Sequence, residues 1–247
     1  MTGDRGLLTR IEAAAVRAWP ALETADISGW LWRFSNGGFQ RANSVSALAF
    51  DGDDVEAAIE EAERRYRTRH APTQFQVSDV SAPRSLVARL AARGYREHDP
   101  CITLAKLVVP DAVTPARVIL AADPTDEWFA LYASSITADR SSAAPRILAK
   151  VPPPRAFALT HRAERPISTA LGVADGDLCA IQCLATADDA RRQGGAAQAL
   201  AAVESWAGRI ECRWLYLQTG LTNTPAITLY RQLGFVEVGR YHYRVRD

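Results

Sequence analysis

A loop rich in glycine and arginine lies in the second half of the chain, between an apolar run and an alanine-rich stretch. The segment spans Leu184 to Leu200 and contains Arg191 and Arg192, followed by Gly194 and Gly195. Glycine lets a ligand approach the backbone, and the first N–H groups of a helix have no partner within the helix. Those donors, the positive end of the helix dipole and two arginines all favour a phosphate. The segment therefore predicts a strand, a loop and a helix start that bind a phosphorylated cofactor.

The spacing of the glycines distinguishes between kinds of phosphate-binding loop. The segment has neither the Gly-Lys-Ser/Thr of a Walker loop nor the Gly-x-Gly-x-x-Gly of a dinucleotide-binding fold. It has Arg191-x-x-Gly194-x-Ala196, which resembles the Arg/Gln-x-x-Gly-x-Gly/Ala loop of the GNAT superfamily of acyl-CoA N-acyltransferases. Taken alone, the loop fits equally well a glycine-rich turn with exposed arginines.

A second signature follows further along the chain. The run Trp214 to Gln218 has the pattern of a strand and precedes Asn223-x-x-Ala226-x-x-Leu229-Tyr230-x-x-x-Gly234-Phe235. This segment resembles the Asn-x-x-Ala-x-x-Leu-Tyr-x-x-x-Gly-Phe pattern of the same superfamily. Two matches in the family's order are hard to obtain by chance, so residues 123–247 are identified as GNAT-like.

The resemblance implies an acetyl-CoA site made of three parts. The end of the strand pairs through its backbone with the amides of the pantetheine arm, beside a splay of strands that admits the acyl group and the amine. The loop and the first helical turn hold the pyrophosphate, and Asn223 meets the arm from the other side. The implied cofactor-binding residues are Leu184, Ala185, Thr186, Arg191, Arg192, Gln193, Gly194, Gly195, Ala196, Ala197, Asn223, Ala226 and Tyr230.

Tyr230 is the catalytic residue that the resemblance implies. Its hydroxyl is expected to point at the CoA sulfur, where the departing thiolate needs a proton or a hydrogen bond. The alternative is a half-buried tyrosine that anchors the last helix. The presence of Asn223 and Gly234-Phe235 in phase with Tyr230 favours the general acid.

The sequence departs from the family's pattern at two places. Asp188 stands where proline is usual, which removes a stiff residue and places an anion near the cofactor. Residues 178–186 contain no Glu or His, although many members keep a base or a water-holding carboxylate there. No base is assigned, and the nearest candidates are Asp175, Asp177 and Glu164.

These residues predict an N-acetyltransferase that moves an acetyl group from acetyl-CoA to a primary amine of a small molecule or peptide by direct attack. The alternative is a module that binds or senses acyl-CoA or a small amine without turnover. The aromatic and basic tail, Arg240 to Arg246, either lines the acceptor groove or forms a simple edge strand, and the edge strand is favoured.

Composition limits the remaining functions. The 247 residues are 48% hydrophobic and 23% charged, as in an ordinary soluble protein with one large or two small domains. The net charge is +1, from 29 basic and 28 acidic residues, which gives no bulk reason to bind nucleic acid or membrane. No apolar run approaches the roughly 20 residues of a membrane span. We expect a cytoplasmic monomer or homodimer.

Cysteine and histidine spacing predicts no metal site. Cys101, Cys179, Cys183 and Cys212 form no Cys-x-x-Cys pair, and the four histidines are scattered. Free cysteines in a reduced compartment pack as small apolar side chains, so we expect thiols in the core.

The two halves of the chain share an order of elements. Each has helix, strand, helix, glycine with an aromatic residue, and strand, which predicts an α/β (α+β) fold with a GNAT-like mixed central sheet flanked by helices, in two tandem copies. A coincidence of two α/β segments is the alternative. We expect residues 1–109 to form a degenerate copy without a cofactor loop, residues 110–122 a linker or first strand, and residues 123–247 the acyl-CoA-binding domain. The first copy has Asp51-Gly-Asp-Asp54 at the loop position, which repels pyrophosphate.

Periodicity and turn residues predict the elements. In the first half they predict helices over 7–19, 55–69 and 83–93, and strands over 30–34, 41–50, 74–80 and 101–109, with an Asn36-Gly37 turn joining the first two strands into a hairpin. In the second half they predict strands over 155–162, 170–173 and 178–186 and a helix over 196–209 that buries Leu200 and Val203.

Overall fold

The computed structural model describes residues 4–247. In this part of the chain the helices are α1 (Arg5–Ala18), α2 (Val55–Arg67), α3 (Leu86–Ala92), α4 (Asp126–Ser134), α5 (Ala138–Leu148), α6 (Gly195–Arg209) and α7 (Thr224–Gln232). The strands are β1 (Glu23–Ile27), β2 (Trp30–Phe34), β3 (Val45–Ser46), β4 (Thr73–Ser78), β5 (Arg96–Leu107), β6 (Val118–Ala121), β7 (Arg155–Arg162), β8 (Arg165–Asp175), β9 (Leu178–Thr186), β10 (Trp214–Gly220) and β11 (Val236–Arg246). None of these helices has the length and apolar character needed to cross a membrane.

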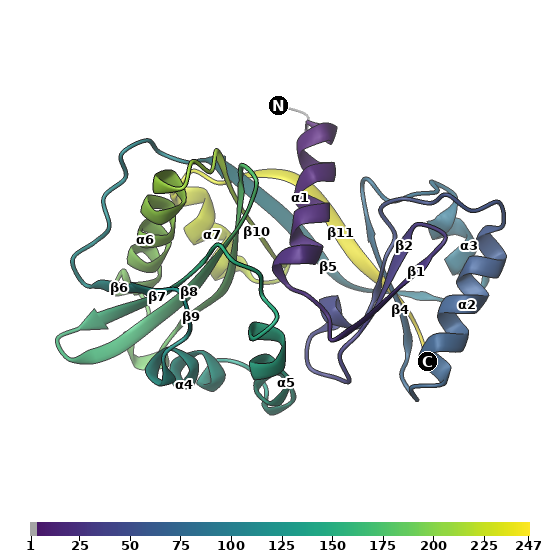
Figure 1. The fold of residues 1–247 in the computed structure, drawn as a ribbon, viewed down its shortest axis with the longest axis horizontal. Coiled ribbons are helices and arrows are strands. Elements are labelled where there is room, and N and C mark those ends of the chain that lie inside the picture. The colour runs from purple at the N-terminus through teal and green to yellow at the C-terminus, as the bar shows by residue number, and fades with distance from the viewer. Residues whose placement is uncertain (1–3) are drawn as a thin grey trace.

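All the strands join one mixed sheet in the order β1-β2-β3-β4-β11-β5-β10-β9-β8-β7-β6. The two halves exchange their last strands, because β5 of the first half pairs with β10 and β11 of the second half pairs with β4. Figure 1 shows β11, in yellow, crossing from the second half into the first. β11 and β5 also pair with each other at the centre of the sheet.

The expectation that residues 240–246 form a simple edge strand is therefore wrong. Tyr241 to Arg246 pair with β4 on one side, and β5 flanks the same strand on the other. A strand bonded on both sides can alternate apolar and polar residues when each face meets a different environment. Tyr241 and Tyr243 are buried, whereas Arg240 is exposed.

Helix α1 belongs to the first half by sequence but packs across the centre of the molecule (Figure 1). Leu7 and Ile11 share one apolar cluster with Leu171 and Tyr216 of the second half. A Cβ atom on Gly239 of β11 would lie 2.5 Å from the Leu8 side chain, so the glycine allows the helix to approach the strand. The first half thus covers part of the sheet of the second.

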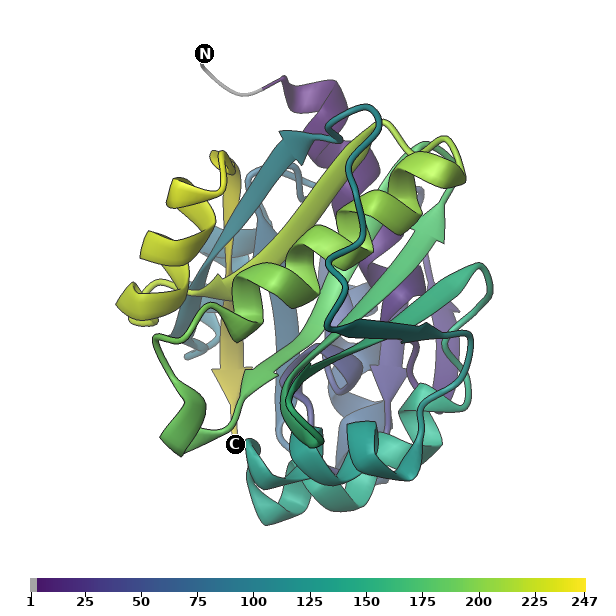
Figure 2. The same ribbon diagram turned by 90° about the vertical axis from the view of Figure 1, so that its left-hand side faces the viewer.

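Helix α6 lies across the other face of the second-half sheet (Figure 2). Leu200 and Val203 are buried there, as predicted. A Cβ atom on Gly172 of β8 would lie 2.7 Å from Val203 Cγ1, so the strand has no room for a side chain under the helix. This tight contact fixes the height of the helix above the sheet.

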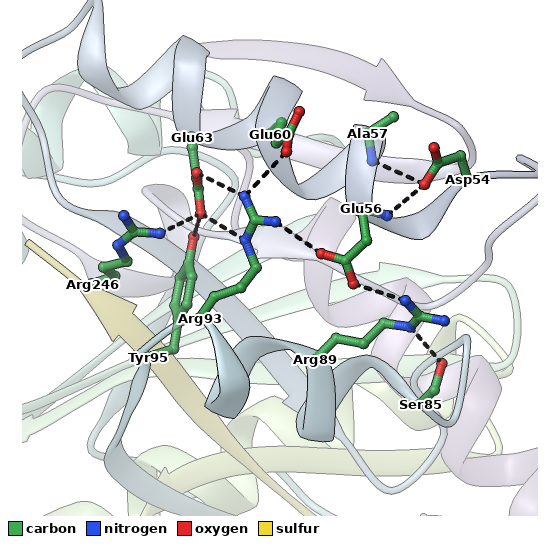
Figure 3. Close-up of polar contacts among 10 residues, drawn as sticks. All are labelled: Asp54, Glu56, Ala57, Glu60, Glu63, Ser85, Arg89, Arg93, Tyr95 and Arg246. Carbon is green, nitrogen blue, oxygen red and sulfur yellow. Dashed lines mark hydrogen bonds and ion pairs between the residues drawn. The ribbon is translucent and has the colours of Figure 1, made fainter.

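In the first half, α2 and α3 are joined by ion pairs that also hold β11. Glu56 of α2 accepts hydrogen bonds from Arg89 at 2.7 Å and Arg93 at 2.8 Å (Figure 3). Glu63 accepts from Arg93 at 3.3 Å and from Arg246 at 2.9 Å. Because Arg246 lies in β11, the cluster fastens the last strand of the second half to the helices of the first.

The turn predicted at Asn36-Gly37 is not a tight hairpin. The tight turn lies at Ser28-Gly29, which have φ of 51° and 83° and join β1 to β2. Two positive φ values give a turn whose twist matches paired strands. Asn36 instead begins a longer loop, in which Asn43 accepts a hydrogen bond from Ser35 N at 2.8 Å.

One helix of the structure has no counterpart in the predictions, and one segment with two predicted alternatives forms a strand. Helix α5 was not predicted, because Pro145 falls inside it. Residues 118–121, left open between linker and strand, form β6 and pair with β7.

Candidate functional site

The loop before α6 has the backbone of an open helix start. Gly194 is the N-cap residue, with φ of 79°, and no side chain caps the helix. Gly195 is required for a different reason, because a Cβ atom there would lie 2.5 Å from Ser168 Oγ. Ala196 and Ala197 follow in the first turn, only partly exposed. The first N–H groups of α6 therefore point away from the helix without a side-chain acceptor among residues 4–247.

Arginines balance the acidic residues of this loop. Arg191 pairs with Asp188 at 2.7 Å, and both side chains are mostly exposed. Asp189 accepts two hydrogen bonds from Arg165, at 2.7 and 2.8 Å, and this contact holds its pKa below the usual value. Within the described chain no carboxylate lies within 4.0 Å of the Arg192 guanidinium. Surface pairs of this kind are weak.

Gln193 is tied to the loop and to the neighbouring hairpin. Its Nε2 donates to Asp189 O at 3.0 Å, and its Oε1 accepts from Arg162. These contacts orient an exposed side chain along the surface of the loop.

The end of β9 carries a bulge. The pairing of β8 with β9 shifts between Thr169 opposite Ala185 and Leu171 opposite Gln182, which leaves two β9 residues opposite one on β8. Cys183 lies in the bulge with φ of 52°, and Thr169 Oγ1 donates to its carbonyl at 2.9 Å. A bulge changes the direction of nearby side chains and backbone groups.

Strand β9 separates from β10 after Ala180, just before the bulge. The two strands pair in parallel only from Leu178 opposite Trp214 to Ala180 opposite Tyr216, although β9 continues to Thr186. The splay that the resemblance implies is thus present, and the edge of β9 that faces β10 has no ladder partner there. Leu184 lies in this stretch, and Thr186 Oγ1 is hydrogen-bonded to Ser168 Oγ at 2.8 Å.

A cavity of about 420 Å³ opens where the strands separate. It brings together Leu184, Asn223 and Tyr230, three of the predicted site residues, and the loop residues 191–197 are not part of its lining. Its other wall comes from the first half and from β11, with Arg41 and Tyr243 among the lining residues. Both halves therefore build the cavity.

Tyr230 has the protonation state that a hydrogen-bond donor needs. Its side chain is 7% exposed, and burial raises the pKa of the phenol to about 12. The ring packs edge to face against Phe235, with centroids 6.0 Å apart. Tyr230 therefore stays protonated at neutral pH, at the wall of the cavity.

Asn223 has a local structural role in this structure. It is the N-cap of α7, and its Oδ1 accepts from Ala226 N at 3.4 Å while its Nδ2 donates to Thr219 Oγ1 at 3.1 Å. The side chain thus fixes the start of α7, which in turn carries Tyr230.

Glu12 is a buried carboxyl beside the cavity that the sequence did not single out. It is 2% exposed, and its Oε1 accepts from Gln218 Nε2 at 2.8 Å and Thr103 Oγ1 at 3.1 Å. Burial raises the pKa of the carboxyl to about 7, against smaller opposing effects of these hydrogen bonds and of Arg41. Since Gln218 lines the cavity, Glu12 is one hydrogen bond away from it.

The carboxylates that the sequence offered as bases lie elsewhere. Asp175 pairs with Arg17 at 2.6 Å and Asp177 pairs with Arg10, both at the surface beside α1, and Glu164 is exposed. A signal for Glu12 was present, because it lies between Leu8 and Ala15 on the apolar face of the first helix. A charged residue on such a face is either paired or functional.

No metal centre is found within the described chain. Residues 4–247 contain no group of three or more His, Cys, Asp or Glu arranged to hold an ion. The four cysteines are free thiols, and Cys101, Cys179 and Cys212 are buried.

A family model and a relative found by comparison with known proteins both describe acetyltransferases. Residues 8–244 match the family described as "Probable histone acetyltransferase Rv0428c C-terminal". The "Uncharacterized N-acetyltransferase YobR" of Bacillus subtilis (strain 168) is 27% identical over 250 residues, which cover 97% of this chain and 98% of that protein.

Solved structures agree on the fold. A GCN5-related N-acetyltransferase from Kribbella flavida has a TM-score of 0.73 at 18% identity, over 100% of this chain and 97% of that one. A tandem GNAT protein from the clavulanic acid biosynthesis pathway has a TM-score of 0.63 at 14% identity, over 96% and 87% of the two chains. These similarities show a GNAT fold along the whole chain.

Proposed function

The chain belongs to the family described as "Probable histone acetyltransferase Rv0428c C-terminal" and is a GNAT-type acetyltransferase, and on this premise we propose that it transfers an acetyl group from acetyl-CoA to a primary amine. The proposal rests on three features of the second half, which are a helix start without a side-chain cap, a strand edge without a ladder partner and a buried, protonated tyrosine. Each suits one part of an acyl-CoA.

The proposed cofactor site follows the order of groups in acyl-CoA. The pyrophosphate binds the N–H groups of Gly195 to Ala197, with Arg191 and Arg192 beside it. The pantetheine amides pair with the free edge of β9 at Leu184 to Thr186, and the arm enters between β9 and α7 near Asn223 and Ala226. The thioester then reaches the cavity that Tyr230 lines.

The proposed reaction is a direct attack. A neutral amine in the cavity attacks the thioester carbonyl and forms the carbon–nitrogen bond, the carbon–sulfur bond breaks, and the leaving thiolate takes a proton from the Tyr230 hydroxyl. The proton that the new amide nitrogen loses returns through solvent to the Tyr230 phenolate, so that the products are the amide and the free thiol. The raised pKa of Tyr230 keeps that proton in place until sulfur develops charge. No covalent intermediate with the enzyme is required.

We also propose that the first half, residues 1–109, is a degenerate copy of the fold, that residues 110–122 include the first strand of the second copy, and that residues 123–247 hold the cofactor. The proposal is supported by the exchange of β5 and β11, which places equivalent strands about the centre of the sheet. The first copy supplies Trp19 and Arg41 to the cavity and leaves cofactor binding to the second.

Release of free thiol from acetyl-CoA in the presence of a panel of primary amines tests the proposed function. We expect release with at least one amine in wild type and none in Gly194→Glu. Tight binding of acetyl-CoA without thiol release from any amine would instead favour the sensing module.

A further inference from the structure

A guanidinium group in the wall of the cavity has few acceptors. Arg41 lies in the loop between β2 and β3, within a short 3-10 turn at Gln40–Ala42, and its Nη1 donates to Gln182 Oε1 at 3.0 Å. Among residues 4–247 this is its one hydrogen bond to a side chain, and no carboxylate lies within 4.0 Å. Arginine has five N–H donors and stays charged, and Arg41 is one of the residues that line the cavity.

Arg33, a buried arginine of the same half, shows how the interior satisfies such a group, whereas Arg41 is half-buried. Arg33 is 1% exposed, and it donates to Ser44 O at 3.0 Å, Ser44 Oγ at 3.1 Å and Gln76 Oε1 at 2.7 Å. Arg33 lies outside the cavity lining and has three acceptors, whereas Arg41 lines the cavity and has one. The missing acceptors of Arg41 are therefore expected from a ligand.

The wall around Arg41 adds donors. Tyr132, Tyr241 and Tyr243 line the cavity and are at most 5% exposed. Burial raises the pKa of each phenol, that of Tyr243 to about 12, so all three keep their protons at neutral pH. Trp19 also lines the cavity, is 2% exposed, and its Nε1 finds no hydrogen-bond partner within the described chain.

The carboxyl groups near Arg41 neutralise little of its positive charge. Glu12 uses its Oε1 for Thr103 and Gln218, and with a pKa of about 7 it is only partly ionised at neutral pH. Asp99 lies at the rim, where its side chain is 56% exposed and 3.3 Å from His98 Nε2. Arg140, also at the rim and exposed, adds a positive charge above the Phe39 ring.

We propose that this cavity binds a carboxylate of the reacting small molecule, held by the Arg41 guanidinium. A carboxylate matches the fork of an arginine and accepts from neighbouring hydroxyl and indole donors. The volume of about 420 Å³ suits a small ligand. The carboxylate belongs either to the amine acceptor, as in an amino acid, or to the acyl group of a dicarboxylic acyl-CoA. The reaction in this inference rests on the proposed function, whereas the carboxylate-binding site does not depend on it.

Calorimetry with pairs of amino acids and their amides, in the presence of saturating CoA, tests the acceptor source. We expect at least one acid to bind wild type about ten- to a hundredfold more tightly than its amide, the range of hydrogen bonds to a charged group. Arg41→Gln should reduce that ratio to below about twofold, and Arg41→Lys should keep part of it. Arg33→Gln, which removes a buried arginine outside the cavity, should keep the ratio of wild type.

Thiol release from succinyl-CoA and butyryl-CoA with neutral amines tests the acyl source. If the acyl chain supplies the carboxylate, wild type should prefer succinyl-CoA by a similar factor, and Arg41→Gln should lose that preference. The inference would be overturned if wild type bound acids and amides equally well and also used succinyl-CoA and butyryl-CoA equally well. It would also be overturned if Arg41→Gln kept the preference for the charged compound. Neither result would count against acetyl transfer. Carboxylate binding without any thiol release would support the subsite and count against the proposed function.

Discussion

In the proposed tandem arrangement helices α2 and α6 correspond to each other, and their N-termini differ in how they are capped. In α2 the Asp54 carboxylate accepts from Glu56 N at 2.9 Å and Ala57 N at 3.1 Å, and Glu56 adds a negative charge to the first turn. In α6 the N-cap is Gly194, no side chain accepts from the helix, and the first turn has no acidic residue. One helix start is closed by a carboxylate, and the other is open to an anion.

The last helix of each half differs in the same sense. Tyr95 N donates to Leu90 O at 3.0 Å, and Phe235 N donates to Tyr230 O at 3.0 Å, so the two helices end alike. This geometry places Leu90 at the position of Tyr230. The first half thus lacks both an uncapped helix start and a phenol at that position, which supports the proposal that only the second half carries the chemistry.

The largest expected effect comes from closing α6 as α2 is closed. We expect Gly194→Glu to weaken acetyl-CoA binding by at least about a hundredfold, because a carboxylate near pyrophosphate costs roughly 4 kcal/mol at an effective dielectric of about 20. Calorimetry measures the change.

Asparagine at position 194 is the matched control for backbone strain, since it tolerates the left-handed conformation without adding charge. Gly194→Asn should lose less than about tenfold. Unchanged affinity in Gly194→Glu would remove this loop from the site.

The next largest effect is expected from removing the hydroxyl of Tyr230. Tyr230→Phe should lower kcat by about ten- to a thousandfold with little change in acetyl-CoA affinity, because the hydroxyl acts on the leaving thiolate in the transition state. Steady-state kinetics with thiol detection separates kcat from KM.

Tyr95→Phe is the matched control, since it removes a buried hydroxyl of the first half that donates to Glu63 at 3.1 Å. It should keep kcat within about twofold while lowering the melting temperature. A Tyr230→Phe enzyme with full kcat and reduced stability would make Tyr230 a packing residue.

Helix α1, which packs between the halves, carries a carboxyl group that makes the folding stability depend on pH. The carboxyl of Glu12 has a pKa of about 7 in the folded chain against an ordinary value of 4.5, so the folded state holds a proton that the unfolded state loses between these values. Folding stability from this group is therefore full below pH 4.5 and falls as the pH rises to 7, by about 3 kcal/mol.

Glu12→Gln should remove that loss. Urea denaturation should show the variant more stable than wild type by about 3 kcal/mol at pH 8 and nearly equal to it at pH 4.5. A constant difference across this range would mean that the carboxyl is solvated and that α1 does not seal the centre of the molecule.

The smallest expected effect comes from opening α2. Asp54→Ala should cost about 1 kcal/mol of stability, as the loss of an N-cap does, and should leave acetyl-CoA affinity unchanged. Gain of a second binding event in calorimetry would show that this cap alone keeps the first half from binding acetyl-CoA.

Local patterns predicted much of the second half. Strands 155–162 and 178–186 match the structure, because apolar runs bounded by turns encode strands directly. The glycine loop and the Asn223 to Phe235 segment lie where the motifs placed them, at the start of α6 and along α7.

The exchange of strands between the halves could not be predicted from local sequence patterns. Whether β11 pairs with β4 or ends at an edge depends on contacts between residues far apart in the chain, such as Tyr243 opposite Gln76. Arg41 was missed because its place in the cavity wall depends on contacts between the two halves, whereas Glu12 had a local signal on the apolar face of α1 that was not used.

Hydrogen exchange on binding of acetyl-CoA tests most directly that only the second half holds the cofactor. We predict slower exchange of the amides of Gly195, Ala196 and Ala197 at the start of α6, and no change at residues 55–57 at the start of α2. Protection at α2, or at both helices, would contradict the account.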